Sequence, residues 1–202
     1  GLSLYSREDW VKVLKIYKEY GINYLRFHTH CPPNAVFDAA DEVGIYMQPE
    51  LTIGGTNGMN VPGPESPLFD PLLEPTMQRW GRELLDWLHN HPSFVMLTLG
   101  NEINGDRSLL ERLVEYLRAQ DPTRMYAQGS NDFIRQQCLS VNDDFWSTMK
   151  TDTPWEYKMA RGSYAHSDLP LGPVQDSKPR NSLRDHSESI KHSPVPVIAF
   201  EL

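Results

Sequence analysis

The stretch "HPSFVMLTLGNEINGD", residues 91–106, decides how the chain folds and where its chemistry is sought. An apolar run, "FVMLTLG", ends in Asn101 and Glu102, and polar loop residues follow. A continuous apolar run of this length predicts a strand that is buried on both faces, as in a parallel sheet. A carboxylate at the end of such a strand is costly unless it is paired or hydrogen-bonded. Glu102 is therefore the first candidate for a functional residue.

The segments around this strand alternate between predicted helices and predicted strands. Apolar residues at helical spacing predict helices over residues 6–20, 32–44, 76–90 and 108–121. Aromatic and apolar residues predict further strands over residues 22–30, 45–51 and 124–131. Residues 52–75, rich in Gly and Pro, predict a long loop, which in a compact domain is usually functional or disordered. This alternation predicts a parallel sheet with covering helices.

The last third of the chain is less regular. Between residues 132 and 194 we predict only one short strand, "GSYAHSD" at 162–168, and "VPVIAFEL" at 195–202 predicts a final buried strand. Two parallel architectures compete, the closed barrel and the open doubly wound sheet. An open nucleotide-binding sheet would normally carry a Gly-rich turn, and the sequence has neither G-x-G-x-x-G nor a P-loop.

Polar residues follow the predicted strands, and this favours the barrel. A TIM barrel keeps its chemistry at the carboxyl ends of its strands. The polar residues at these positions are His28, His30, Glu50, Asn101, Glu102, Asn131, His166 and Glu201. The predicted fold is therefore α/β, a (β/α)8 TIM barrel.

Composition limits the partners. The chain has 202 residues and a formal net charge of -8, so nothing in its average charge favours nucleic acid or an acidic membrane surface. No apolar run approaches the roughly 20 residues of a membrane span. Cys31 and Cys138 are too few for a disulfide framework and lack the C-x-x-C spacing of a metal site, so we interpret both as ordinary thiols.

Two groups of residues suggest chemistry. Strand side chains alternate, so Arg26, His28 and His30 are predicted to share one face and to point into the barrel mouth. Glu102 and Glu201 each end an apolar strand. Two carboxylates that face each other across a barrel mouth are what glycoside hydrolysis needs, one as proton donor and one as nucleophile or base.

Three segments resemble glycoside hydrolase family 2, a family of retaining barrel glycosidases. "GINYLRFHTHCPPNAVFDAADEVGIYMQPE", "HPSFVMLTLGNEINGD" and "VPVIAFEL" are similar to its second strand, second helix, third strand, fourth strand and seventh strand, in order. The resemblance implies that Glu102 is the general acid/base and that Asn101 hydrogen-bonds the sugar 2-hydroxyl. It also implies that Glu201 is the nucleophile.

The resemblance implies roles for further residues. Arg26 would steady the nucleophile, and His30 and His28 would bind substrate. Glu50 matches an acidic residue at the end of the third strand. Tyr164 matches a sixth-strand tyrosine that donates to the nucleophile, and His166 lies beside it in "RGSYAHSD". No organic cofactor is implied, but some relatives hold a divalent cation at the positions of Glu50 and Glu102.

The same register predicts an incomplete barrel. It leaves the first and eighth strands and the accessory β-sandwich domains unmatched, so we expect residues 1–202 to be a partial TIM-barrel catalytic domain of a larger multidomain glycosidase. We expect little or no activity from this chain alone. The expected partners are a carbohydrate substrate and other domains of the parent chain. The parent is expected to be secreted or periplasmic, with any signal peptide outside this segment.

Alternatives remain open at this point. His28-x-His30 on a strand is typical of metal-dependent amidohydrolases, with His166 as a further ligand and Glu50 as a bridging acid. A non-catalytic carbohydrate-binding barrel would hold sugar without cleaving it. Among the tryptophans, Trp80 and Trp87 have helical spacing and are predicted to lie in the core. Trp146 and Trp155 are candidate sugar platforms over the mouth, and His89 and His91 are predicted to be structural.

Overall fold

Helices and strands alternate along the chain in the predicted order. A computed structural model describes residues 4–53, 60–130, 140, 142–147 and 193–198. The helices are α1 (Arg7–Glu19), α2 (Asn34–Val43), α3 (Leu73–Leu88) and α4 (Arg107–Gln120). The strands are β1 (Tyr24–Arg26), β2 (Tyr46–Gln48), β3 (Glu50–Ile53), β4 (Asn60–Val61), β5 (Met96–Gly100), β6 (Asn104–Gly105), β7 (Met125–Ala127), β8 (Trp146–Ser147) and β9 (Val197–Ile198).

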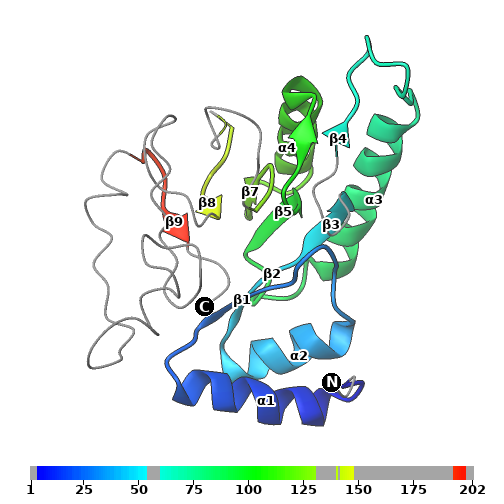
Figure 1. Cartoon of the computed structure of the whole chain (residues 1–202). Coiled ribbons are helices and arrows are strands. Elements are labelled where there is room, and N and C mark those ends of the chain that lie inside the picture. Colours follow the sequence, from blue (N-terminus) through cyan, green and yellow to red (C-terminus); the bar gives the residue numbers. More distant parts are fainter. Residues whose placement is uncertain (1–3, 54–59, 131–139, 141, 148–192, 199–202) are drawn as a thin grey trace, which may run out of the picture.

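The strands pair in parallel with their neighbours in the chain. β1 pairs with β2, β5 lies between β3 and β7, and β8 pairs with β9. Parallel bridges Met47–Phe94 and Ser130–Ser147 join these pairs into one series (Figure 1). β4 and β6 form a separate parallel pair just beyond the carboxyl ends of β3 and β5. Sequential parallel pairing with helical crossovers is the arrangement of a (β/α) barrel.

Local sequence signals set the helix ends. The Ser6 side chain caps α1 by accepting the Asp9 N–H at 3.1 Å. α2 ends at Gly44, which has φ of +77° and takes the left-handed conformation that a side chain would disfavour. Asp106 caps α4 by accepting the Ser108 N–H at 3.0 Å. α3 begins at Leu73, inside the predicted loop.

The core lies between one face of the strands and the helices. Apolar side chains on this face include Met47, Leu97 and Tyr126, which are buried with residues of all four helices. Figure 1 shows α1 packed on α2 and α3 beside α4, and these pairs are in contact. The opposite strand face is polar, with Gln48 and Thr98 buried on it. Alternation along the strands therefore separates an apolar outer layer from a polar interior.

The structure corrects one prediction about tryptophans and one about strands. Trp80 and Trp87 are 40% and 51% exposed, because the buried face of α3 is formed by Leu84, Leu85 and Leu88. Trp146 lies in β8, a strand that the sequence did not predict, and the predicted strand at 162–168 lies outside the described residues. β8 has two residues, too few to show a strand period in the sequence.

Among the described residues, none of the helices has the length and apolar character needed to cross a membrane.

Candidate active site

A buried ion pair lies at the carboxyl ends of the first strands. Glu50, the first residue of β3, is 1% exposed. Arg26 at the end of β1 donates from Nε to Glu50 Oε1 at 2.7 Å and from Nη2 to Oε2 at 3.2 Å. The Thr29 N–H donates to Oε2 at 2.7 Å. This bidentate arginine contact fixes the orientation of the carboxylate and compensates its negative charge.

Two hydroxyl groups complete the surroundings of Glu50. Thr98 Oγ1 and Ser130 Oγ donate to Glu50 Oε1 at 3.0 and 2.7 Å. Both hydroxyls accept from Gln48 Nε2, at 3.0 and 3.3 Å. The Tyr24 hydroxyl donates to Gln48 Oε1, and burial raises the pKa of this phenol, which keeps it a donor. The chain of hydrogen bonds thus runs from β1 through β2 and β5 to Ser130, beyond the end of β7.

The Asn101–Glu102 pair joins this cluster at the end of β5. Asn101 is buried, and its Oδ1 accepts from Arg26 Nη2 at 2.6 Å. Glu102 is half-buried, and its N–H donates to the Ser130 carbonyl at 2.8 Å. Glu102 has φ of +50°, a conformation that non-glycine residues adopt only when their surroundings hold them. The carboxylate at 102 is therefore presented by a fixed, strained turn.

The structure brings together the predicted site residues Arg26, Glu50 and Asn101, with Glu102 next to them. It does not bring in His28 and His30, which are both exposed. The prediction that they share a face with Arg26 is wrong, because β1 ends at Arg26 and the chain turns through Thr29, whose φ is +57°. The strand-borne histidine pair of the amidohydrolase alternative is therefore not formed.

Other predicted residues lie outside the described residues: Cys138, Asn131, Trp155, Tyr164, His166 and Glu201. Sequence reasoning missed Gln48, Thr98 and Ser130. Their only signal is a small or neutral polar side chain inside an apolar strand or just after one, as in "MLTLG" and "YAQGS". Such residues are common in proteins, so the signal becomes specific only when Glu50 is seen beside them.

The cluster does not suit a divalent cation on Glu50. A carboxylate has about four lone-pair positions. Five N–H and O–H donors already occupy the two oxygens of Glu50. Within the described part of the chain, no group of three or more His, Cys, Asp or Glu side chains is arranged to hold a metal.

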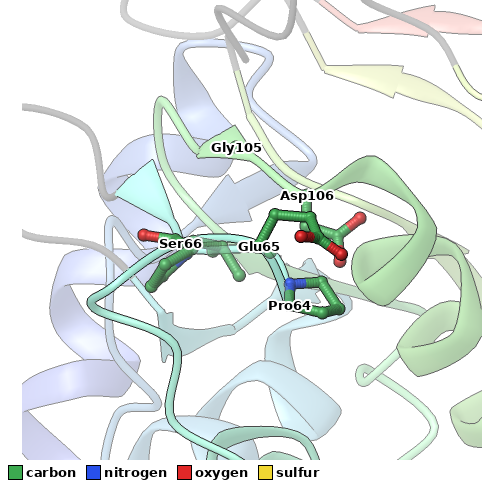
Figure 2. A pocket seen from close by; sticks show the side chains of 8 residues that line it. Pro64, Glu65, Ser66, Gly105 and Asp106 are labelled. Atoms are coloured by element: carbon green, nitrogen blue, oxygen red, sulfur yellow. The ribbon is translucent and has the colours of Figure 1, made fainter.

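A pocket lies beside the loop that follows Glu102. Its volume is about 370 Å³, and residues 61–66 line it together with Gly105 and Asp106. Figure 2 shows the Glu65 and Asp106 side chains at this pocket. Gly105 has φ of +114°, and a Cβ there would lie 2.1 Å from the Val61 carbonyl oxygen. Only glycine therefore allows β4 and β6 to pair and shape this wall.

Parallel strands, helical crossovers and polar side chains gathered at the carboxyl ends of the strands define the class of TIM-barrel domains. Within this class, the chain belongs to the family described as "Glycosyl hydrolases family 2, TIM barrel domain", which matches residues 4–170. The family predicted from the sequence is confirmed.

Relatives of known sequence and structure agree with this family. The chain is 30% identical over 132 residues to a beta-galactosidase of Lactococcus lactis subsp. lactis, a match that covers 64% of this chain and 13% of that protein. The chain spans about an eighth of the length of the curated relatives it matches.

Solved structures share the fold. A beta-glucuronidase of Parabacteroides merdae superposes with a TM-score of 0.62 at 17% identity, over 96% of this chain and 22% of that chain. A beta-D-glucuronidase of Dictyoglomus thermophilum gives 0.59 at 24% identity, over 73% of this chain and 26% of that chain.

Proposed function

We propose that the chain supplies part of the catalytic barrel of a retaining β-glycosidase. The observation that carries this proposal is the Asn101–Glu102 pair at the carboxyl end of β5, tied by Arg26 to the buried Glu50 carboxylate. Family membership supports a carbohydrate substrate. The substrate class is a glycan with a terminal β-linked sugar, since relatives are named beta-galactosidase and beta-glucuronidase.

In the proposed reaction, Glu102 donates a proton to the leaving-group oxygen while a Glu201 oxygen attacks the anomeric carbon. The glycosidic C–O bond breaks, and a covalent glycosyl-enzyme forms. Water then attacks the same carbon, Glu102 takes the proton of that water, and Glu201 leaves as a carboxylate. Asn101 hydrogen-bonds the sugar 2-hydroxyl. Two inversions at one carbon give net retention of configuration.

The proposal makes a geometric demand. A retaining pair of carboxyl groups is about 5 to 5.5 Å apart, whereas an inverting pair is about 6.5 to 9.5 Å apart. The distance between the Glu102 and Glu201 carboxyl groups in a ligand-bound crystal structure tests this directly. A separation in the inverting range contradicts the retaining mechanism.

The proposal is tested with the full-length polypeptide that contains this chain. We expect it to hydrolyse a nitrophenyl β-galactoside or β-glucuronide with retention of the anomeric configuration, which NMR of the released sugar measures. Glu102→Gln removes the proton donor and should lower kcat/KM by about 10²- to 10⁴-fold for a natural glycoside, whose leaving group is poor. The matched control is Glu83→Gln on the exposed surface of α3, which should leave activity unchanged.

A carbohydrate-binding barrel without catalysis gives a different result. It would bind the sugar in calorimetry, show no turnover, and keep its affinity in Glu102→Gln. Inversion of configuration, or full turnover by Glu102→Gln, also contradicts the proposed mechanism.

We further propose that this 202-residue chain alone has little or no activity. The stretches that match this chain make up only 12% and 13% of the curated relatives, which supports a barrel and a site that include further polypeptide. Measurable turnover of a nitrophenyl glycoside by the chain alone contradicts this part of the proposal. It leaves the role of Glu102 standing.

A further inference from the structure

The Asn101–Glu102 pair is tied to Glu50 by two separate routes. The first uses side chains, because Arg26 Nη2 donates both to Glu50 Oε2 at 3.2 Å and to Asn101 Oδ1 at 2.6 Å. The second runs through Ser130. Its hydroxyl donates to Glu50 Oε1 at 2.7 Å, and its carbonyl accepts the Glu102 N–H at 2.8 Å.

Ser130 is well placed to hold the turn at Glu102. It is completely buried, so solvent does not reach it. Its N–H donates to the Gly100 carbonyl at 2.9 Å, and its carbonyl accepts from Glu102, so its two main-chain bonds bracket Asn101. Glu102 has φ of +50°. The carbonyl of Ser130 is thus the main-chain partner of a residue whose conformation needs external support.

We infer that Ser130 is a positioning residue that couples the buried Glu50 carboxylate to the main chain of Glu102. The Ser130 hydroxyl fixes its own residue against Glu50, and its carbonyl fixes the direction in which the Glu102 carboxyl leaves the turn. Glu50 is then the anchor of the site and does not touch substrate. This inference rests on the proposed function, because it assumes that Glu102 is the proton donor.

Leaving groups separate positioning from general damage. A dinitrophenolate leaves without being protonated, whereas an alkyl alcohol needs the proton that the general acid supplies. A misdirected Glu102 carboxyl therefore slows cleavage of a methyl glycoside more than cleavage of a dinitrophenyl glycoside. A loss of folded protein, or of sugar binding, slows both alike.

The experiment measures kcat/KM for both glycosides in the full-length polypeptide. Ser130→Ala should lower kcat/KM for both glycosides, and the loss for the methyl glycoside should be about tenfold larger than the loss for the dinitrophenyl glycoside. This difference is smaller than the roughly 10²- to 10⁴-fold effect typical of removing a general acid, because Glu102 itself is still present. Ser130→Thr keeps the hydroxyl and should restore most of the difference. Thr98→Val removes another donor to Glu50 but leaves the Glu102 bond, so its effect should be equal on both glycosides.

Ser147 offers a matched control. It is the bridge partner of Ser130 on the next strand and is equally buried, and its hydroxyl has no hydrogen-bond partner among the residues described. Ser147→Ala should leave the ratio between the two glycosides unchanged.

Two failures are distinguishable. If Glu102→Gln shows no preference for the good leaving group, the proposed function fails and the inference fails with it. If Glu102→Gln shows the preference and a folded Ser130→Ala does not, only the role of Ser130 is overturned. Should Ser130→Ala not fold, Ser130→Cys keeps a weak donor of similar size, and equal losses on both glycosides in that variant overturn the inference.

Discussion

Two buried polar clusters lie at opposite ends of the parallel strands. The cluster at the carboxyl ends surrounds Glu50. The cluster at the amino ends surrounds Asp41 of α2, whose Oδ2 contacts His91 Nδ1 at 2.6 Å and whose Oδ1 accepts the Ser93 N–H at 2.9 Å. The second ring nitrogen of His91 lies 2.9 Å from Asn34 Oδ1. His91 is thus structural, as the sequence predicted.

The clusters differ in what they hold. Next to His91, Arg124 donates to the carbonyls of His89 at 2.7 Å and of Phe94, and its guanidinium lies 5.2 Å from the Phe94 ring centroid. The amino-end cluster therefore holds the main chain of residues 89–94 against α2, largely through main-chain N–H and carbonyl groups. The carboxyl-end cluster joins side chains of successive strands and ends at a strained Glu102. Hydrogen bonds and ion contacts thus stabilise the fold at the amino ends of the strands, and at the carboxyl ends they position functional groups.

Breaking the ion pair at the carboxyl end should have the largest effect. Arg26→Met leaves the buried Glu50 carboxylate without its cation, and this should lower the free energy of unfolding by about 3–5 kcal/mol. Urea unfolding of this chain measures the loss. The double variant Arg26→Met/Glu50→Gln should recover part of it, because no uncompensated charge remains. A loss below about 1 kcal/mol would mean that the pair behaves like a surface salt bridge.

Breaking the amino-end cluster should affect stability alone. Asp41→Ala leaves His91 and the Ser93 N–H without their acceptor and should cost about 1–3 kcal/mol. The control is Asp38→Ala on the same helix, whose carboxylate accepts from Asn34 at 3.3 and 3.4 Å. In the full-length polypeptide, kcat/KM of folded Asp41→Ala should equal that of the parent. A changed kcat in folded Asp41→Ala would contradict the prediction that the amino-end cluster affects stability alone.

The sequence predicts the position of the carboxyl-end cluster better than the hydrogen bonds within it. Strand order, the helices between strands and the place of Asn101 and Glu102 follow from local patterns, because burial imposes a period on each element. The turn that exposes His28 and His30 does not follow from such a pattern. It depends on the Thr29 N–H reaching Glu50, a contact 21 residues away in sequence.

Short elements and small side chains carry the least signal. β8 has two residues and shows no period, so the sequence does not predict this strand. Ser130 follows β7 in "YAQGS" and resembles any turn serine. Its importance arises from its partners Gln48, Glu50 and Gly100 on three other strands, and single-sequence patterns contain no information about such pairings.

A third carboxylate, which is buried, sharpens the comparison, because it is held mainly by main-chain groups. Asp143 lies in the connection from β7 to β8 and accepts the N–H groups of Gln128 and Ser140, each at 2.8 Å. Burial raises the pKa of Asp143 to about 6 from the ordinary 3.8, although these two hydrogen bonds act in the opposite direction. Glu50 and Asp41, by contrast, each contact a basic side chain.

The raised pKa predicts how stability depends on pH. The folded chain binds the Asp143 proton more tightly than the unfolded chain, so this stabilisation is complete below pH 3.8 and is lost as the pH rises through about 6. Each unit of pKa elevation corresponds to about 1.4 kcal/mol. The difference in unfolding free energy between the parent chain and Asp143→Asn, measured in urea from pH 4 to 7.5, isolates this term from all other carboxylates. The parent should lose stability relative to Asp143→Asn between pH 4 and 6, and a constant difference across this window would show that folding does not raise the pKa of Asp143.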